Sequence, residues 1–333
     1  MNSAYTPTVG ASQLEKNSTT SIKNLPVNLF GSVMGLAGLA LAWRLSGQYY
    51  GIGGVFGEAI GALAGMVFVL LTLGYLIKWA KHPGVVKAEF NHPISSNFFG
   101  TVTIALLLLS AVAAPHNKLL GQGLWILGSA LTVLLAGLVV SRMLSGNQDP
   151  LNAVPAWLIP GVATLDIAVT GEHIQMIWAA EFNLFALAVG AVLAMVFFTR
   201  IFQRLVHETM LAKGMMPSLM VLIAPFEVGF LAYTSVFGET DRFASVLFYF
   251  GLFLFVILSF KIFRRDVPFS PSWWAISFPV AALSNAALKY AHARENTVLM
   301  AIAAVILLFL TAALTVLLVK TLISLFSGKL LTD

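Results

Sequence analysis

The residues of this sequence that could do chemistry are the ionisable side chains inside its long apolar stretches, since a charge is costly within a membrane. Glu227 lies near the middle of the stretch 217–237, two residues after Pro225. A carboxylate at that depth must be protonated, paired or in contact with water. Two interpretations follow: a titrating group used in transport, or a structural hydrogen bond to backbone freed by the proline. Asp166 lies nearer the outer end of its stretch than the centre, and three further ionisable groups lie near predicted ends: Glu58, Glu181 and Lys289.

Histidine, the commonest metal ligand, is missing from the centres of these stretches. The six histidines all fall in loops or within a turn or two of the end of a stretch: His82, His92, His116, His173, His207 and His292. No pair is therefore placed to ligate a haem inside the membrane. The chain has no cysteine, no HExxH and no GxxxxGK[ST] motif. We predict no catalytic residue, no metal site and no cofactor, and hence a protein that is not an enzyme.

The composition explains where these stretches must lie. Charged residues make up 10% of the 333 residues and hydrophobic residues 59%, against roughly 25% charged in ordinary soluble domains. The apolar surface is too large to hide in one globule, so membrane lipid is the expected solvent. The net charge of +5 could suggest a nucleic-acid partner, but the basic residues cluster at alternate ends of the apolar stretches. We therefore predict no binding of nucleic acid.

Ten apolar stretches are long enough to be membrane-spanning helices, which need about 20 residues each. They are 26–44, 55–80, 95–114, 119–144, 154–171, 177–203, 217–237, 243–263, 272–290 and 298–326. Of the Lys and Arg residues, 14 fall in the tails or where even-numbered stretches end, and 5 fall in the opposite loops. The positive-inside rule then puts both termini in the cytoplasm, with Asn147 cytoplasmic and Asn117 external. We predict a disordered cytoplasmic tail over 1–24, a transmembrane domain over 25–327 and a short cytoplasmic tail over 328–333.

A period of proline and glycine distinguishes the odd-numbered stretches from the even-numbered ones. Each odd stretch begins at or near a proline: Pro26, Pro93, Pro155, Pro217 and Pro271. A second set lies slightly deeper in the same five stretches: Pro160, Pro225 and Pro279, with Gly31 and Gly100 at comparable depth. No even-numbered stretch contains a proline.

Proline inside a helix removes a hydrogen bond and bends the helix, which a membrane tolerates where the backbone is buried or lines a cavity. The pattern predicts an all-α integral membrane protein of five hairpins, with five kinked inner helices around a pore and five outer helices. Two simpler interpretations stay open: proline as an ordinary helix start, and kinked helices that pack irregularly. Phe278 precedes Pro279, and in a ring its side chain could turn toward the axis.

Three short runs resemble a known family: Trp273-Trp274-Ala275-Ile276-Ser277-Phe278-Pro279, Phe30-Gly31 and Ile223-Ala224-Pro225. The chain resembles the tellurite-resistance/dicarboxylate transporter family over all ten stretches. Within that family it looks closest to the bacterial TehA branch, which is related to the slow anion channels of plant guard cells.

The resemblance implies a homotrimer in the bacterial inner membrane, with one pore in each subunit, closed near mid-membrane by Phe278. It also implies passage of small inorganic anions such as chloride and nitrate, and an association with tellurite resistance. Gly31 falls on a small-residue position, where a larger side chain would intrude on the pore. Glu227 has no place in the family pattern.

Two transport mechanisms remain open at this point. A passive anion channel needs a smooth, weakly polar pore, and the inner stretches offer Gly, Ser, Thr and Phe rather than basic residues. A proton-coupled C4-dicarboxylate carrier would need a titrating group and a basic anchor at mid-depth. Glu227 could supply the titrating group, but the sequence offers no anchor. We therefore favour the channel.

Overall fold

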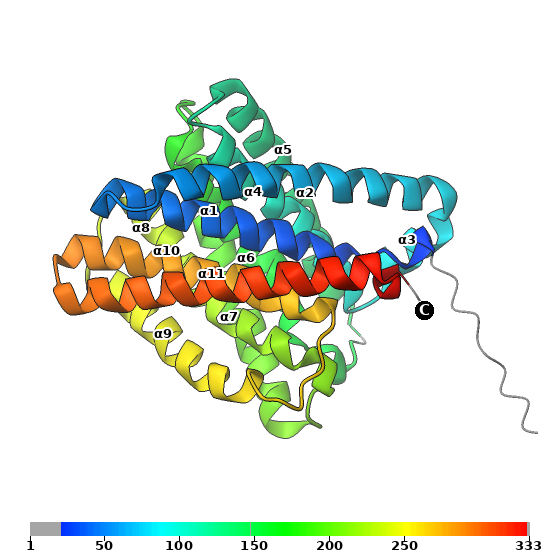
Figure 1. Ribbon diagram of the computed structural model, residues 1–333. Coiled ribbons are helices and arrows are strands. Elements are labelled where there is room, and N and C mark those ends of the chain that lie inside the picture. The colour runs from blue at the N-terminus through cyan, green and yellow to red at the C-terminus, as the bar shows by residue number, and fades with distance from the viewer. Residues whose placement is uncertain (1–20, 147, 332–333) are drawn as a thin grey trace, which may run out of the picture.

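The computed structural model describes residues 21–146 and 148–331, and this part of the chain forms eleven α-helices and no strand. The helices are α1 (Gly31–Tyr50), α2 (Gly54–Lys81), α3 (Pro83–Asn91), α4 (Phe99–Ala113), α5 (Lys118–Leu144), α6 (Leu158–Thr170), α7 (Ala179–His207), α8 (Ala224–Phe237), α9 (Arg242–Ile262), α10 (Ser277–Arg294) and α11 (Thr297–Phe326). Figure 1 shows α2 and α11 along the outside of the bundle with α1 between them.

Eight helical segments are long and apolar enough to cross a membrane, which makes this a multi-pass membrane protein. They correspond to eight of the ten predicted stretches. The other two correspond to α6, which has 13 residues, and to α10, which carries several polar residues. Of the predicted tails, 21–24 form a turn in which the Ser21 N–H bonds the Leu331 carbonyl, while 1–20 and 332–333 lie outside the described residues, as does Asn147.

Consecutive helices pack as five hairpins: α1 with α2, α4 with α5, α6 with α7, α8 with α9, and α10 with α11. The first members of these hairpins also pack against one another in a closed cycle, α1–α4–α6–α8–α10–α1. Between 72% and 83% of the residues in the apolar windows of α1, α4 and α8 are buried, against 11% to 39% for the five second members. The first members therefore form an inner ring, and the second members cover it from outside.

Each inner helix begins with a 3₁₀ segment that runs directly into the α-helix. The segments are η2 (Val27–Phe30), η3 (Ser95–Phe98), η5 (Pro155–Trp157), η7 (Lys213–Ile223) and η8 (Pro271–Ile276). They contact one another in the same cyclic order as the helices that follow them. We call this second ring the 3₁₀ collar; it stacks on the end of the inner ring where the inner helices begin.

The prolines of the deeper set mark the change from 3₁₀ to α geometry. Pro160 and Pro279 are the third residues of α6 and α10, and Pro225 is the second residue of α8. In the first turn of an α-helix the backbone N–H has no intrahelical partner, so proline costs little there. The bend predicted inside each helix is thus realised as a change of winding at its start. Gly31 and Gly100 occupy the same transition in α1 and α4.

The short helix α3 has no counterpart among the predicted stretches, and it contacts the collar from the side. Its Glu89 carboxylate accepts hydrogen bonds from the Lys78 ammonium at 2.6 Å, the Tyr75 hydroxyl at 2.9 Å and the Val27 N–H at 3.1 Å. Lys78 is buried and also donates to the Leu25 carbonyl. A buried charge needs such a partner, and this ion pair ties the end of α2 to the first residue of η2.

Glycine brings α1 and α10 into close contact. A Cβ on Gly38 would lie 2.7 Å from the Ala281 Cβ, and a Cβ on Gly35 would overlap the side chain of Ser277. Small residues at a helix interface allow backbones to approach in this way inside a membrane. The Ser277 hydroxyl is shared between the carbonyls of Gly31 at 3.0 Å and Trp274 at 2.6 Å. The first turn of α10, which carries Phe278, is therefore held firmly against α1.

Candidate ion pathway

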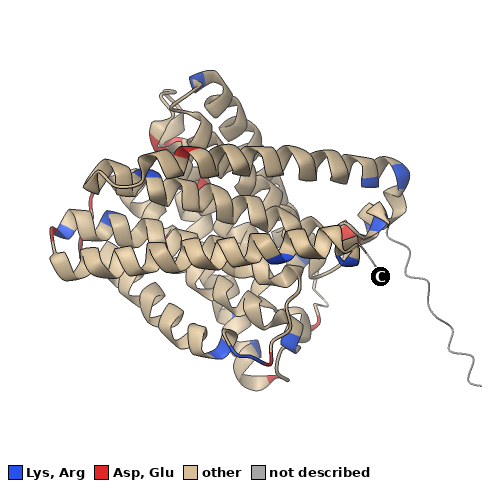
Figure 2. Ribbon diagram, viewed as in Figure 1, with Lys and Arg blue, Asp and Glu red and all other residues tan. Residues whose placement is uncertain are grey.

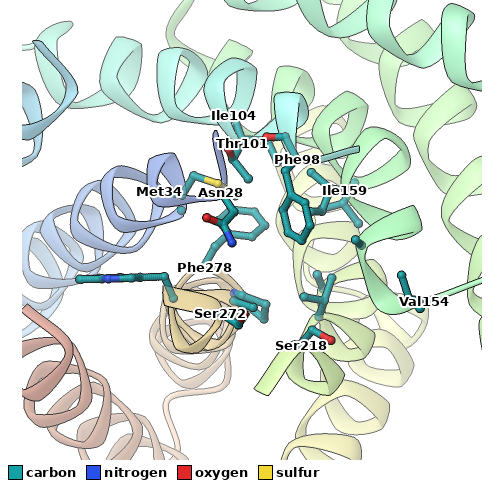
Figure 3. Close-up of a pocket in the computed structure, with 18 of the residues that line it drawn as sticks. Asn28, Met34, Phe98, Thr101, Ile104, Val154, Ile159, Ser218, Ser272 and Phe278 are labelled. Atoms are coloured by element: carbon teal, nitrogen blue, oxygen red, sulfur yellow. Dashed lines mark hydrogen bonds between the residues drawn. The ribbon is translucent and has the colours of Figure 1, made fainter. Parts of the chain in front are cut away.

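Two cavities lie along the rings. The first, which we call the apolar cavity, has a volume of about 140 Å³ and is enclosed mainly by the 3₁₀ collar. Figure 3 shows Met34, Phe98, Ile159 and Phe278 around it, with the Asn28 amide among them. Two of its hydroxyl groups donate to backbone: Thr101 to the Phe98 carbonyl, and Ser218 to the Met215 carbonyl.

The second cavity, which we call the polar cavity, has a volume of about 420 Å³ and lies at the opposite end of the inner ring. Its ionisable lining residues are Arg44, Tyr49, Asp166, Glu172, His173 and Lys289. Glu172 and His173 are exposed, so the cavity reaches the surface beside them.

Phe278 is the one described residue that lines both cavities. Its side chain is 7% exposed, and it is the second residue of α10, where the collar meets the inner ring. Its position follows from the anchored first turn of α10 described above. Phe278 therefore lies at the junction of the two cavities.

The structure divides the other predicted site residues into two groups. Gly31 and Pro279 line the apolar cavity next to Phe278. A Cβ on Gly31 would be 3.7 Å from the Trp274 Cβ, an ordinary contact distance, so alanine fits there. Pro160, Pro225 and Gly100 lie outside both cavities. A Cβ on Gly100 would be 2.7 Å from the Ile159 Cγ2, which makes this glycine a packing position between α4 and α6.

Glu227 points away from both cavities. Glu227 is fully buried, and neither of its carboxylate oxygens has a hydrogen-bond partner among the described residues. A Cβ on Gly251 of the outer helix α9 would overlap this carboxylate, which places the side chain between α8 and α9. The acid that the sequence analysis singled out is thus not on the axis of the ring.

Asp166 lines the polar cavity. Its position nearer an end of its predicted stretch had made it a weaker candidate than Glu227. Asp166 is 2% exposed, and its Oδ2 has no hydrogen-bond partner in the described part of the chain. Helical spacing places Val169 and Thr170, three and four residues further on, on the same helix face as Asp166. Both residues line the same cavity.

The long apolar helices surround two cavities, and comparison with known families gives the class of protein. Residues 24–322 match the model of the SLAC1 family, described as voltage-dependent anion channel. The chain belongs to this family. The predicted resemblance is thereby confirmed, and a family of channels agrees with the prediction that the protein is not an enzyme.

Individual relatives are distant in sequence but similar over most of this chain. The chain is 26% identical to the guard cell S-type anion channel SLAC1 of Arabidopsis thaliana, over 90% of this chain and 56% of the relative. The S-type anion channel SLAH3 of the same plant is also 26% identical, over 90% and 48%. The tellurite resistance protein TehA homolog of Haemophilus influenzae is 26% identical over 80% and 82%. The chain thus spans about half the length of the plant relatives.

Proposed function

We propose that this protein is a passive channel for small monovalent anions, with its pathway along the axis of the inner ring and its closed gate at Phe278. The observation that carries the proposal is that Phe278 lines both axial cavities and lies at their junction. In this proposal both helices of each of the five hairpins cross the membrane. This includes the short α6 and the polar α10, because both belong to the closed inner ring.

The barrier to ions in the closed state is one of dehydration. A phenyl ring in a narrow apolar passage offers no hydrogen bond to replace the water around an anion. The apolar cavity on one side of Phe278 is lined mainly by apolar side chains, and the hydroxyls of Thr101 and Ser218 there donate to backbone carbonyls. Removing the ring joins the two cavities and lets water enter from the polar side.

The test is anion flux through purified protein in liposomes. Phe278→Ala should raise chloride and nitrate flux at least tenfold over wild type, with Phe278→Leu between them. Phe98→Ala removes a ring that lines only the apolar cavity, and Phe260→Ala removes a ring from the outer surface of α9; both should stay near wild type. A folded Phe278→Ala protein that passes no more anion than wild type would refute the gate.

The proposed orientation puts the 3₁₀ collar and both termini in the cytoplasm. Outer helices end in basic residues, among them Lys81, Arg142, Arg204 and Lys261, and Figure 2 shows most Lys and Arg at its right and lower edges. Because the chain has no cysteine, Met210→Cys and Ile177→Cys, both in exposed loops, can be probed with an impermeant thiol reagent on intact spheroplasts. Only Ile177→Cys should react, and the reverse labelling would invert the orientation.

The proposed setting is the bacterial inner membrane, with the protein as a homotrimer that has one pathway in each subunit. Chloride and nitrate are the proposed permeant ions, and an association with tellurite resistance is proposed by analogy with the TehA homolog. Reversal potentials in bilayers with asymmetric salts would measure the anion preference. Native mass spectrometry would measure the number of subunits, and a monomer would contradict the trimer.

The alternative function, a proton-coupled carrier, is less favoured, because its proposed titrating group, Glu227, faces α9 rather than the cavities. Glu227→Gln keeps the shape of the side chain and removes its charge. In the channel proposal this change leaves anion flux and its pH dependence unaltered. Loss of proton-driven C4-dicarboxylate uptake in this variant would instead support the carrier.

A further inference from the structure

A buried acid in the pathway of an anion channel calls for an explanation. Asp166 lines the polar cavity, which ends at Phe278, and is 2% exposed. Its Oδ2 has no hydrogen-bond partner among the described residues. The Asp166 backbone carbonyl accepts from the Thr170 hydroxyl at 2.7 Å. The unpartnered Oδ2 is therefore available to whatever occupies the cavity.

The other strong charges of the polar cavity are already paired. Arg44 binds Glu58 through two contacts of 2.7 Å and donates to the Ala111 and Val112 carbonyls. Lys289 lies 3.8 Å from the Glu172 carboxylate, which also accepts from the Ser235 hydroxyl at 3.2 Å. Pairing cancels most of the field of such groups at a distance.

The elements that pack against α6 add few other ionisable groups. His173 lies at the exposed mouth of the polar cavity, and His116 is paired with Glu58 outside it. The cavity-lining residues of α4 and α8 are uncharged among those that the structure describes. On α5 and α7, the ionisable groups nearest this end are Lys118 and Glu181, in the first turns of those helices and outside the cavity. Asp166 is thus the unpaired acid of the pathway.

We propose that Asp166 sets the passage of anions through the polar cavity: in its neutral form it donates a hydrogen bond to a passing anion, and in its ionised form it repels the anion. The inference rests on the proposed channel function. A carboxylic acid has one O–H donor when protonated and only acceptors when ionised. An anion in the enclosed cavity is therefore stabilised by the first form and opposed by the second. Anion flux should rise as the solution on the polar-cavity side is acidified.

The experiment compares Phe278→Ala with Phe278→Ala/Asp166→Asn in liposomes, because the gate must be open for the cavity to control flux. Asparagine keeps the size of the side chain and a permanent donor, and cannot ionise. The double variant should pass chloride about tenfold faster near neutral pH, and its flux should no longer depend on the pH of the polar-cavity side. The parent should approach the double variant as that side is acidified.

Glu227→Gln in the same Phe278→Ala parent is the matched control. It neutralises a second fully buried acid, which lies outside both cavities, and should change neither the rate nor its pH dependence. His173→Gln tests the other titrating group of the cavity mouth and should leave the pH dependence in place. Asp166→Ser, a smaller donor, provides a second neutral variant if the asparagine variant does not fold, and it should show the same loss of pH dependence.

The outcomes separate the inference from the function on which it rests. If the Phe278→Ala parent conducts but neutral variants at Asp166 leave rate and pH dependence unchanged, the inference is wrong and the channel stands. If pH dependence persists in those variants and disappears in His173→Gln, the histidine is the responsible group and the inference is again wrong. If the parent conducts no better than wild type, the gate proposal fails, and the inference fails with it.

Discussion

The two axial cavities differ in what they offer an ion, although the same phenylalanine lines both. The apolar cavity is surrounded by side chains such as Met34 and Val221, and the hydroxyls of Thr101 and Ser218 in its wall are bonded to backbone. The polar cavity is about three times larger and carries the ionisable groups of the pathway, Asp166 and Lys289 among them. In the proposed channel, the apolar barrier therefore extends beyond Phe278 into the collar, whose residues line the apolar cavity.

The largest effect should come from narrowing the apolar cavity in the open variant. In the Phe278→Ala background, Gly31→Leu should lower anion flux at least tenfold, because a side chain at this position projects into the space that ions must cross. Gly31→Ala is the matched control, since its Cβ meets Trp274 only at an ordinary contact distance of 3.7 Å. Liposome flux assays measure both. Equal flux in the leucine variant would mean that ions do not pass this glycine.

A smaller effect should follow from making the apolar cavity more polar while the gate is intact. Met34→Gln places an amide of similar length in the cavity wall, where Figure 3 shows the methionine pointing inward. Water should then occupy the cavity more readily, and the anion leak of the otherwise wild-type protein should rise about threefold. Met34→Leu, which stays apolar, should not change it. An unchanged leak in the glutamine variant would limit the barrier to Phe278 alone.

The smallest effect should come from Arg44, a cation of the polar cavity that is already paired. In the Phe278→Ala background, Arg44→Gln removes one cation and leaves Glu58 with only His116 as partner. We expect anion flux to fall about twofold, and more at low salt, because screening is weaker there. Arg44→Gln/Glu58→Gln restores the local balance and should recover the flux. A double variant as slow as the single one would show that the loss is structural.

Much of the architecture could be predicted from the sequence because membrane helices leave a strong pattern. The proline and glycine period of the odd-numbered stretches corresponds to the transitions at Gly31, Gly100, Pro160, Pro225 and Pro279. The collar could not be predicted, since 3₁₀ and α segments use the same apolar residues and packing between segments decides the winding. The short helix α3 was missed because its nine residues lack an apolar face long enough to stand out.

The acids show why depth along a helix is a poor guide to which side chains face a cavity. Glu227 lies near the middle of its predicted span yet faces α9, whereas Asp166 lies nearer an end and faces the polar cavity. Depth can be counted along a sequence, but the direction of a side chain depends on which neighbours surround its helix. Phe278 could be placed because its proline neighbour and the family resemblance both pointed to it.

The winding of η7 has a consequence for how the pathway could open. A 3₁₀ helix rises about 2.0 Å per residue and an α-helix about 1.5 Å. Over its 11 residues, η7 is therefore about 5 Å longer than the same residues would be as an α-helix. It packs along η8, the segment that leads directly into Phe278. If η7 rewound into an α-helix, it would shorten and shift η8, the segment beside Phe278. The helices of the five hairpins could keep their places in the membrane during this change.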